Sequence, residues 1–384
     1  MSEWITNSIE PELCDIIAGG TPPTENKEYW NGDILWITPA DMSRLGRRFI
    51  SESERRITSK GVKYSTGKLM PTNSVIISCR APVGYCVMAT EPFTTNQGCK
   101  TLLCKKIEPG YLYYYLLGST AQLMKVSSGT TFLELSKKEL GRFQVSFPVN
   151  VQIQREIVKI LESIDAVIDK TRDTLNKYRD VKKGLLQDFF HDGEIVSLSD
   201  KRYFALNPST RKLPPAFYYV DLESVVDGML LVLKPEERAS APSRAQRLLQ
   251  KNDILFQMVR PYQQNNLFFT LEADLPFVAS TGYAQIRTNQ NPIYVYYALH
   301  TFDFVSDVNR RCTGSNYPAI NSTELSKVQF RLPNRKVQDE IASYMTAIDK
   351  TIQDELVNLD KFENVKIGLV KDLLSGKREI SYVN

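Results

Sequence analysis

The chain contains the stretch Val181-Lys182-Lys183-Gly184-Leu185, and 184 residues later it contains Val365-Lys366-Ile367-Gly368-Leu369. The same offset pairs further identical residues, namely Gln154 with Gln338, Glu156-Ile157 with Glu340-Ile341, Ile164-Asp165 with Ile348-Asp349, Ile168 with Ile352, and Asp188 with Asp372. A slip of one residue extends the match upstream, to Gly129 and Gly314, Glu139-Leu140 and Glu324-Leu325, and Pro148 and Pro333. Self-similarity at one fixed period indicates that the chain is a tandem duplication.

Both repeated tails have the apolar periodicity of a long helix. Residues of the apolar stripe recur in steps of three and four: first Ile153, Ile157, Ile160, Ile164, Ile168, Thr171, Leu175 and Tyr178, and then Val337, Ile341, Met345, Ile348, Ile352, Leu356, Leu359 and Phe362. No proline interrupts either run, so we expect one helix over residues 151–190 and another over 336–376, each roughly 60 Å long. The simplest partner for each stripe is the other helix, in an antiparallel coiled coil. The alternative is that each helix packs separately on its own domain.

The segments that precede the two helices contain patterns typical of strands and patterns typical of helices. In residues 1–150, the runs 73–78 and 101–104 predict short buried strands and 111–124 predicts a helix. Residues 191–335 mirror them with strands over 253–256 and 283–286 and a helix over 293–302. We therefore expect a mixed α/β fold with a pseudo-two-fold internal repeat. Its parts would be a first α/β domain (1–150), a central long helix (151–190), a second α/β domain (191–335) and a C-terminal long helix (336–376).

Composition places the chain among ordinary globular proteins. Its 384 residues are 42% hydrophobic and 24% charged, and the longest apolar stretch, Met229 to Leu233, is too short to cross a bilayer. The N-terminus lacks the basic and apolar regions of a secretion signal, so a cytoplasmic location is expected. Residues 1–150 carry a net charge of +3 and residues 191–335 carry +2, whereas residues 336–384 carry −2. A polyanionic partner should therefore lie against the two α/β domains.

A search for catalytic and metal sites yields only partial matches. The six cysteines form no CxxC pair and the two histidines stand alone, which argues against a zinc site. Asn291-Pro292-Ile293-Tyr294 is close to the Asn-Pro-Pro-Tyr of amino-methyltransferases but lacks the second proline and an upstream glycine-rich turn. The segment 61–68 is one residue too long for a P-loop. Asp15, Glu25 and Lys27 imitate a nuclease site, but glycines and prolines that a strand does not accommodate separate them. We therefore expect a binding protein that is not an enzyme.

Two kinds of residue predict contact with DNA. From Arg44 to Lys68, eight basic residues stand against two acidic ones, which suits phosphate contact, although a merely solvated face is the alternative. Loops with arginine, tyrosine and amide side chains suit the reading of base edges, as in residues 260–266, whose counterpart in the first half is Arg80-Ala81-Pro82. Glycine loops at 127–131 and 310–317, just before the long helices, allow close approach to phosphates or bases, although each could be a plain turn. The candidate DNA-binding residues are Arg44, Arg47, Arg48, Arg55, Arg56, Lys68, Arg80, Asn96, Gln97, Lys100, Thr130, Thr131, Arg260, Tyr262, Gln263, Gln264, Asn265, Asn266, Arg310, Arg311, Ser315, Asn316 and Tyr317.

The chain resembles the specificity subunits of Type I restriction-modification systems. The stretch Gly19-Gly20-Thr21-Pro22, followed by Tyr29-Trp30, Gly32-Asp33-Ile34, Trp36-Ile37 and Asp41, resembles the opening of a target-recognition domain in that family. Asn96-Gln97-Gly98-Cys99-Lys100 resembles another motif of those domains. The two tails, from Pro148 through Gln154-Arg155-Glu156-Ile157 to Gly184-Leu185-Leu186 and from Pro333 through Gln338-Asp339-Glu340-Ile341 to Gly368-Leu369, resemble its two conserved helical regions. The resemblance covers essentially the whole chain, and the order, spacing and duplication of the motifs are more specific than any single one.

The resemblance implies a function and a set of partners. Two target-recognition domains would each read one half of a bipartite, asymmetric site in double-stranded DNA. The antiparallel helices would dock two methyltransferase subunits, and motor-nuclease subunits would complete a site-specific deoxyribonuclease and adenine methyltransferase. S-adenosylmethionine, ATP and magnesium would belong to those partners, so this chain would be non-catalytic and hold no cofactor. Tyr218-Tyr219-Val220-Asp221-Leu222 opens the second domain without a Gly-Gly-Thr-Pro motif, so unlike half-sites are expected. Two alternatives stay open: a methyltransferase or nuclease subunit with a degenerate site, and a coiled-coil scaffold that binds no nucleic acid.

Overall fold

The computed structural model describes residues 3–80, 82–127, 133–208 and 212–376, which form two compact units. Unit 1 comprises residues 1–173 together with 357–384, and unit 2 comprises residues 174–356. Both long helices are therefore divided between the units. The last helix of the chain completes the unit that contains the first strand.

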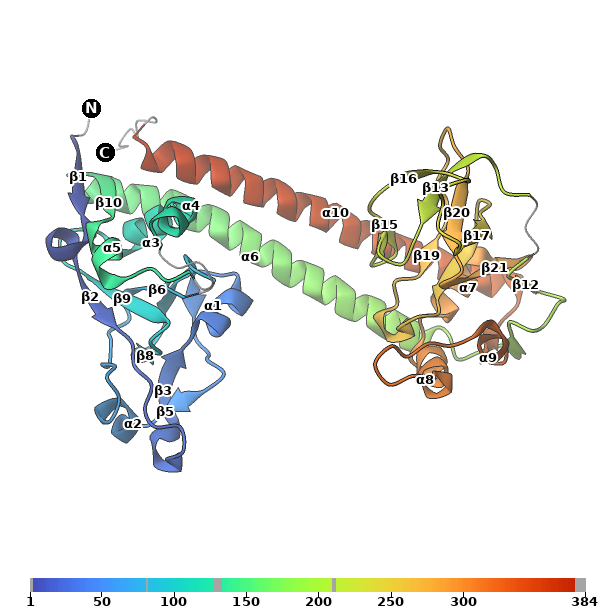
Figure 1. The fold of residues 1–384 in the computed structure, drawn as a ribbon, viewed down its shortest axis with the longest axis horizontal. Helices are drawn as coiled ribbons and strands as arrows, with labels where there is room; N and C mark the ends of the chain where they lie inside the picture. The colour runs from blue at the N-terminus through green and yellow to red at the C-terminus, as the bar shows by residue number, and fades with distance from the viewer. Residues whose placement is uncertain (1–2, 81, 128–132, 209–211, 377–384) are drawn as a thin grey trace. The chain divides into compact units, whose positions relative to one another are not determined.

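Unit 1 has a mixed α/β fold (Figure 1). One sheet has the order β2-β9-β6-β7-β4, with β2 at Cys14–Ala18, β9 at Cys99–Cys104, β6 at Val75–Ser78, β7 at Cys86–Ala89 and β4 at Phe49–Ile50. A second sheet has the order β5-β3-β8, with β5 at Arg56–Ile57, β3 at Trp30–Ile37 and β8 at Phe93–Thr95. The strand β1 (Trp4–Ser8) pairs antiparallel with β10 (Gln144–Pro148). The short helices are α1 (Pro39–Leu45), α2 (Ser59–Lys63), α3 (Pro109–Gly118), α4 (Thr120–Val126) and α5 (Lys137–Arg142).

Unit 2 repeats this strand order with small differences. One sheet has the order β12-β21-β18-β19, with β12 at Phe204–Leu206, β21 at Tyr283–Thr288, β18 at Ile254–Gln257 and β19 at Leu267–Phe268. The other has the order β16-β13-β20-β17, with β16 at Lys234–Glu237, β13 at Ala216–Val220, β20 at Phe277–Ser280 and β17 at Ala245–Leu248. The strand β11 (Glu194–Ser197) pairs with β22 (Gln329–Leu332), and β14 (Val225–Val226) with β15 (Met229–Leu230). The short helices are α7 (Pro292–Ala298), α8 (Phe302–Arg311) and α9 (Ser322–Ser326).

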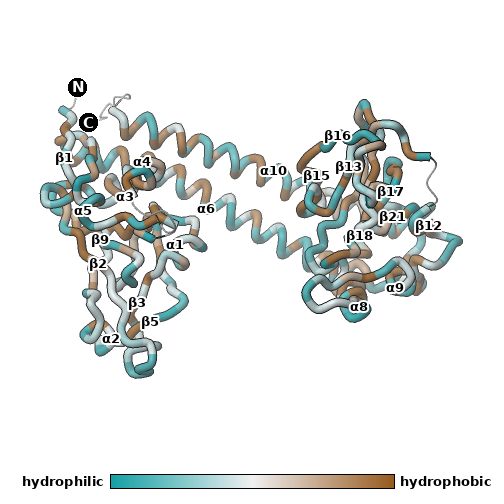
Figure 2. The backbone as a smooth tube through the Cα atoms, in the orientation of Figure 1, coloured by the Kyte–Doolittle hydropathy of each residue, from teal (hydrophilic) through white to brown (hydrophobic). Residues whose placement is uncertain are grey.

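The two long helices are α6 (Val151–Asp188) and α10 (Arg335–Leu374). Each begins at an asparagine cap: the side chain of Asn150 accepts from the backbone N–H of Gln152 (2.9 Å), and that of Asn334 accepts from the backbone N–H of Val337 (3.2 Å). Apolar and polar residues alternate along both helices (Figure 2), as expected where one stripe is covered. No helix among the described residues combines the length and apolarity needed to cross a membrane.

The ends of the long helices are built into the hydrophobic cores. In unit 1, Leu373 and Leu374 of α10 are buried in the same cluster as Ile153 and Ile157 of α6. In unit 2, Phe190, just beyond the end of α6, lies in the cluster that contains Ile341 and Met345 of α10. Each core therefore needs apolar side chains from both helices, and the expectation of a mixed α/β fold with two long helices packing together is confirmed.

A Tyr-Asp-Lys cluster joins the helices in each unit. In the first cluster, the hydroxyl of Tyr114 on α3 donates to Oδ2 of Asp165 (2.7 Å), and Nζ of Lys366 lies 2.6 Å from Oδ1 of the same carboxylate. The contacts of Asp165 with Lys366 and of Arg172 with Glu363 (2.6 Å) show that α6 and α10 run in opposite directions within unit 1. Burial raises the pKa of the Tyr114 hydroxyl, which keeps it protonated as a donor.

The second cluster lies in unit 2 and also consists of a tyrosine, an aspartate and a lysine. The hydroxyl of Tyr297 on α7 donates to Asp349, and Nζ of Lys182 lies 2.6 Å from Oδ1 of that carboxylate. Asp349 and Lys366 stand 184 residues after Asp165 and Lys182, so the sequence repeat is also a repeat of contacts. Removing the aspartate or the lysine would leave a partly buried charge without its partner, which costs more than losing the whole pair.

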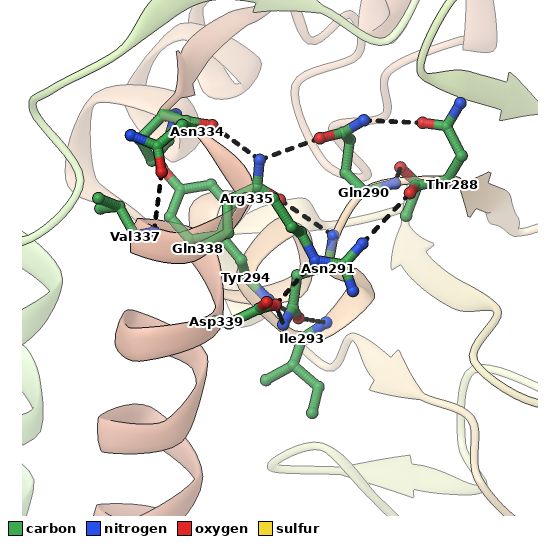
Figure 3. A network of polar contacts seen from close by, with 12 residues as sticks. Thr288, Gln290, Asn291, Ile293, Tyr294, Asn334, Arg335, Val337, Gln338 and Asp339 are labelled. Atoms are coloured by element: carbon green, nitrogen blue, oxygen red, sulfur yellow. Dashed lines mark hydrogen bonds and ion pairs between the residues drawn. The ribbon is translucent and has the colours of Figure 1, made fainter.

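Two fully buried glutamines attach α3 and α7 to the long helices. Oε1 of Gln154 accepts from the backbone N–H of Glu108 (2.9 Å), and its Nε2 donates to the carbonyl of Pro148 (2.8 Å). Gln338 accepts from the backbone N–H of Asn291 (3.0 Å), as Figure 3 shows, and its Nε2 donates to the carbonyl of Pro333 (2.8 Å). Each side chain satisfies backbone groups that would otherwise be buried without partners.

Candidate nucleic-acid interface

The loop at residues 258–266 lies between β18 and β19 and contains two glutamines and two asparagines, and we call it the amide loop. It contains a 3-10 helix at Pro261–Gln263, and the side chain of Tyr262 on that helix is 52% exposed. Arg260 (φ 54°) and Gln264 (φ 53°), on either side of the helix, adopt the left-handed conformation that favours glycine. Non-glycine residues hold this conformation where the surroundings fix it, and such positions cluster at functional sites.

A second loop of unit 2, residues 312–319 after α8, packs against the amide loop, and we call it the glycine loop. Thr313 pairs with Ala319 across Gly314, whose φ of 91° requires glycine. The backbone N–H of Arg260 donates to the carbonyl of Pro318 (2.7 Å), and the Arg260 guanidinium lies 4.4 Å from the ring centroid of Tyr317. The two loops thus present an arginine stacked on an exposed tyrosine, with no carboxylate in ion-pair contact with that arginine among the described residues.

The remaining candidates of unit 2 surround this pair. Ser315 and Asn316 are exposed on the glycine loop. A pocket of about 420 Å³ connects the amide loop to α8 and is lined by Gln264, Phe302, Val305, Ser306, Asn309 and Arg310. Arg310 and Arg311 are both held by Asp307, at 3.3 and 3.0 Å, so their charge is partly neutralised within the protein.

In unit 1, three loops meet around the Gly-Gly-Thr-Pro motif. A Cβ on Gly19 would lie 2.0 Å from the carbonyl oxygen of Asn96, and a Cβ on Gly20 would lie 2.3 Å from the backbone nitrogen of Gly67. The hydroxyl of Thr21 donates to the side chain of Gln97. The motif therefore needs its glycines because it passes between two other turns. The two sequence motifs that carry the family resemblance in this domain lie in contact, with Gln97 exposed.

The basic segment 44–68 divides into exposed residues and residues bound to α6. Arg55 is exposed and stacks on Trp30, with its guanidinium 3.4 Å from the ring centroid. Arg44 pairs with Glu54 (2.8 Å) and Arg56 with Glu91 (2.9 Å), both near the surface. Lys68 is exposed and makes no hydrogen bond or ion pair with the described residues. These four basic residues can approach a phosphate.

Two further arginines of this segment pair with carboxylates of the long helix α6, and we therefore leave them out of the proposed interface. Arg47 pairs with Asp169 (3.6 Å) and with Asp173 of α6, and Arg48 pairs with Glu162 of α6. Arg48 is only 9% exposed, and its guanidinium lies 5.3 Å from the ring centroids of Tyr113 and Tyr114. The three carboxylates were not recognised from the sequence as partners of the arginines. One signal existed: positions 184 residues later are Thr346, Gln353 and Val357, so the acidic face is particular to α6.

Two further candidates are buried, and two lie outside the described residues. Lys100 is only 6% exposed, and its Nζ donates to the carbonyl of Leu135 (2.6 Å), so this side chain stabilises the fold. Asn266, 1% exposed, accepts from the backbone N–H of Gln257 (2.8 Å). Neither side chain can reach DNA, and both are withdrawn from the interface. Thr130 and Thr131 fall in 128–132, outside the residues that the structure describes.

Arg80 does not occupy the position of Arg260, which corrects the pairing expected from the sequence. The backbone N–H of Cys79 donates to the carbonyl of Gly98, and that of Met258 donates to the carbonyl of Gly282, so Cys79 and Met258 are equivalent. Arg80 therefore matches Val259, one residue before Arg260. Arg80 is half-exposed and lies 3.4 Å from Glu134.

Two residues considered for chemistry in the sequence, Asn291 and His300, have structural roles in the described fold. The side chain of Asn291 caps α7 by accepting from the backbone N–H groups of Ile293 (2.9 Å) and Tyr294 (3.0 Å). Burial lowers the pKa of His300 to about 4, so its imidazole is neutral at physiological pH. Among the described residues, no three or more His, Cys, Asp or Glu side chains gather as a metal site would require.

We predict that Arg260 reads a base and that Arg55 and Arg56 contact phosphates. Arg260→Ala should relax the preference at one position of the half-site read by unit 2, by about 1–3 kcal/mol. Replacing Arg55 and Arg56 by alanine should weaken binding to all sequences and reduce the salt dependence. Titrations of cognate and mismatched duplexes at several salt concentrations would separate the two roles. Arg202→Ala is the control, because Arg202 is exposed but held by Asp200 and Glu194. A uniform, salt-dependent loss for Arg260→Ala would mean that Arg260 is a phosphate contact.

The sequence matches a family model described as the Type I restriction modification DNA specificity domain, over residues 1–177 and 241–366. The MjaIX specificity subunit of a Type I restriction enzyme from Methanocaldococcus jannaschii is 31% identical over 245 residues, which are 63% of this chain and 54% of that protein. The EcoR124I/EcoR124II specificity subunit from Escherichia coli is 30% identical over 181 residues, 45% of this chain and 43% of that protein. The matched part of the chain thus spans about half the length of these relatives.

One solved structure shares the fold over nearly the whole chain. It is the S subunit of a Type I restriction-modification system from M. genitalium, with a TM-score of 0.60 at 14% identity, covering 99% of this chain and 97% of that one.

Proposed function

Because the chain belongs to the Type I restriction-modification DNA specificity family, we propose that it is the subunit that selects the DNA sequence on which such a system acts. The observation that carries the proposal is that loops of each unit carry exposed basic or other polar side chains, which are Arg55, Lys68 and Gln97 in unit 1 and Tyr262, Gln263 and Asn316 in unit 2. Each unit would read one half of a bipartite, asymmetric site in double-stranded DNA. Unlike half-sites are expected, because the Gly-Gly-Thr-Pro motif of unit 1 has no equivalent at the start of β13.

The proposed interface is smaller than the set of candidates in the sequence. In unit 1 it consists of Arg44, Arg55, Arg56, Lys68, Arg80, Asn96 and Gln97. In unit 2 it consists of Arg260, Tyr262, Gln263, Gln264, Asn265, Arg310, Arg311, Ser315, Asn316 and Tyr317. The basic members would neutralise phosphates and orient the duplex, and the amides, tyrosines and Arg260 would contact base edges.

The long helices would serve as a spacer and as a docking surface. We propose that α6 and α10 form an antiparallel coiled coil with pseudo-two-fold symmetry, held by the two Tyr-Asp-Lys clusters. Two methyltransferase subunits would dock on it, and motor-nuclease subunits would join that core. S-adenosylmethionine, ATP and magnesium would be bound by those partners, so that this chain contributes recognition without chemistry.

We predict that the purified chain neither methylates nor cuts DNA and that it acquires both activities only with its partners. Its affinity for duplex DNA should fall roughly a thousandfold between about 50 and 200 mM salt if about six phosphates are neutralised. Methyl-transfer and cleavage assays with the chain alone, and then with the methyltransferase and motor-nuclease subunits, check the first point. Activity of the chain alone that rises with its concentration would contradict the non-catalytic assignment. DNA affinity that does not respond to salt would favour a scaffold.

A further inference from the structure

The strands β6 and β18 are equivalent in the two units, and each ends in a buried polar residue. The side chain of that residue forms hydrogen bonds to the loop that follows the strand. In unit 1 this residue is Ser78, the last residue of β6, which is fully buried. Its hydroxyl accepts from the backbone N–H of Tyr85 (2.9 Å) and donates to the carbonyl of Pro82 (2.7 Å). One side chain thus joins Pro82 and Tyr85, two described residues that follow β6.

In unit 2 the equivalent residue is Gln257, the last residue of β18, which is 3% exposed. Its Oε1 accepts from the backbone N–H of Asn265 (3.0 Å), and its Nε2 donates to the side-chain Oε1 of Gln263 (3.1 Å). Gln257 therefore accepts from the far end of its loop and donates into the middle, as Ser78 does. The amide loop has nine residues between the strands where unit 1 has seven, and the longer glutamine spans the larger loop.

The hydrogen-bond polarity of the amide loop is fixed by backbone groups. Because the N–H of Asn265 can only donate, the atom of Gln257 that faces it is the oxygen, and the atom that faces Gln263 is the nitrogen. Gln263 must then turn its own oxygen inward. The Nε2 of Gln263 donates to no described residue, so this exposed side chain offers a donor to whatever lies outside.

A second branch of the network anchors the end of the loop. The backbone N–H of Gln257 donates to Oδ1 of Asn266, so the Nδ2 of Asn266 faces Nε2 of His300 (3.0 Å). Nε2 must accept, which places the imidazole proton on Nδ1, where it donates to the carbonyl of Tyr296 (2.7 Å). Every described bond of this branch has one donor and one acceptor, so the branch has a single consistent arrangement.

We infer that Ser78 and Gln257 are positioning residues for sequence recognition: each holds its loop in the conformation that reads one half-site, without contacting DNA. This inference rests on the proposed function. It also assigns Gln263 a donor role, so the base it meets should present an acceptor, such as N7 of a purine, O6 of guanine or O4 of thymine. A preformed loop loses less entropy on binding than a loop that orders on the DNA.

The test compares variants of the full chain, assembled with its methyltransferase partner, on a duplex library with randomised half-sites. Ser78→Ala should broaden the methylated motif in one half only, and Gln257→Leu in the other half only. Discrimination against single mismatches should fall about tenfold in the affected half, as for the loss of a buried hydrogen bond. Gln263→Ala removes the partner of Gln257 and also the side chain assigned to the base, so it should broaden the same half as Gln257→Leu without endangering the fold, and for this half Gln257→Leu alone tests the bracing.

Matched control variants distinguish the loss of a hydrogen bond to the loop from a general loss of stability. Ser74→Ala removes another fully buried hydroxyl, which donates to the carbonyl of Pro71 (2.8 Å) ahead of the same strand. Gln285→Leu removes a fully buried amide that donates to Leu248 and Asp253. These controls should leave the motif unchanged at comparable changes in melting temperature.

Three results would overturn the inference: an unchanged motif for folded Ser78→Ala and Gln263→Ala, equal broadening of both halves by either variant, or the same broadening by Ser74→Ala. In each of these cases the wild-type chain would still give a two-part motif. Failure of the proposed function would appear instead as a wild-type complex whose methylation shows no two-part motif.

Discussion

Deleting seven residues from each long helix, 168–174 from α6 and 352–358 from α10, is expected to shorten the spacer between the half-sites by about three base pairs. Seven residues are nearly two helical turns, so the apolar stripe stays in phase. At 1.5 Å per residue each helix loses roughly 10 Å, and DNA rises about 3.4 Å per base pair. Bending of the DNA could reduce the change. The half-site sequences should not change, because no loop of the proposed interface is altered.

The two deletions preserve both Tyr-Asp-Lys clusters, which would hold the shortened helices together, although they remove Arg172 and with it the ion pair to Glu363. They lie between Asp165 and Lys182 on α6 and between Asp349 and Lys366 on α10, so both Tyr-Asp-Lys clusters keep their members. They remove Asp169 and Asp173, the partners of Arg47, so some loss of affinity is expected.

Methylome sequencing of cells that carry this variant would measure the spacer. Deleting 168–174 alone is the control, because the clusters then fall out of register and activity should be lost. Retained activity with an unchanged spacer would show that the length of the helices does not set the spacer length. Changed half-site bases would show that the helices contact DNA.

A fragment of residues 1–190 is expected to form a dimer. In the full chain, unit 1 takes Lys366, Leu373 and Leu374 from α10, and the fragment lacks all three. Residues 174–190 of the fragment repeat 358–374, with Lys182 at the place of Lys366. In a symmetric dimer, Lys182 of one copy can therefore pair with Asp165 of the other, and the apolar stripe of each helix is covered.

Sedimentation at micromolar concentration would detect this dimer. Lys182→Glu should weaken it, since the charge opposite Asp165 is reversed, whereas Lys177→Glu, at an exposed position of the same helix, is the matched control. A stable monomer would count against the pairing of the two helices.

The sequence predicts the periodic parts of this fold and misses the contacts between distant charges. The apolar stripes place the long helices to within two residues at either end, since α6 spans 151–188 and α10 spans 335–374. A single helix expected over 111–124 is instead α3 and α4, separated at Ser119. The helix expected over 293–302 ends at Ala298, and α8 begins at Phe302. Small or polar residues lie at both breaks, Gly118-Ser119-Thr120 at the first and His300-Thr301 at the second, and the prediction continues each helix through them because apolar residues follow.

The site is harder to predict because a charge in the sequence does not reveal its partner. Arg47 and Arg48 belong to a basic run, but their carboxylates lie more than 100 residues away on α6. Lys100 forms no ion pair within the described part of the chain; it donates to the backbone carbonyl of Leu135, which only the fold brings near. The sequence does not predict a role for Ser78 or Gln257, because a serine or a glutamine at the end of a strand belongs to no recognisable motif. Their equivalence becomes visible only when the strands of the two units are matched.

The central claim is that this chain selects a two-part DNA site, and the methylome tests it most directly. Cells that express the chain with its methyltransferase partner should carry methylated adenines in one motif, made of two unlike half-sites with a fixed spacer. The motif should disappear when the chain is omitted and return when it is restored. A continuous motif, or the same methylation without the chain, would contradict the account.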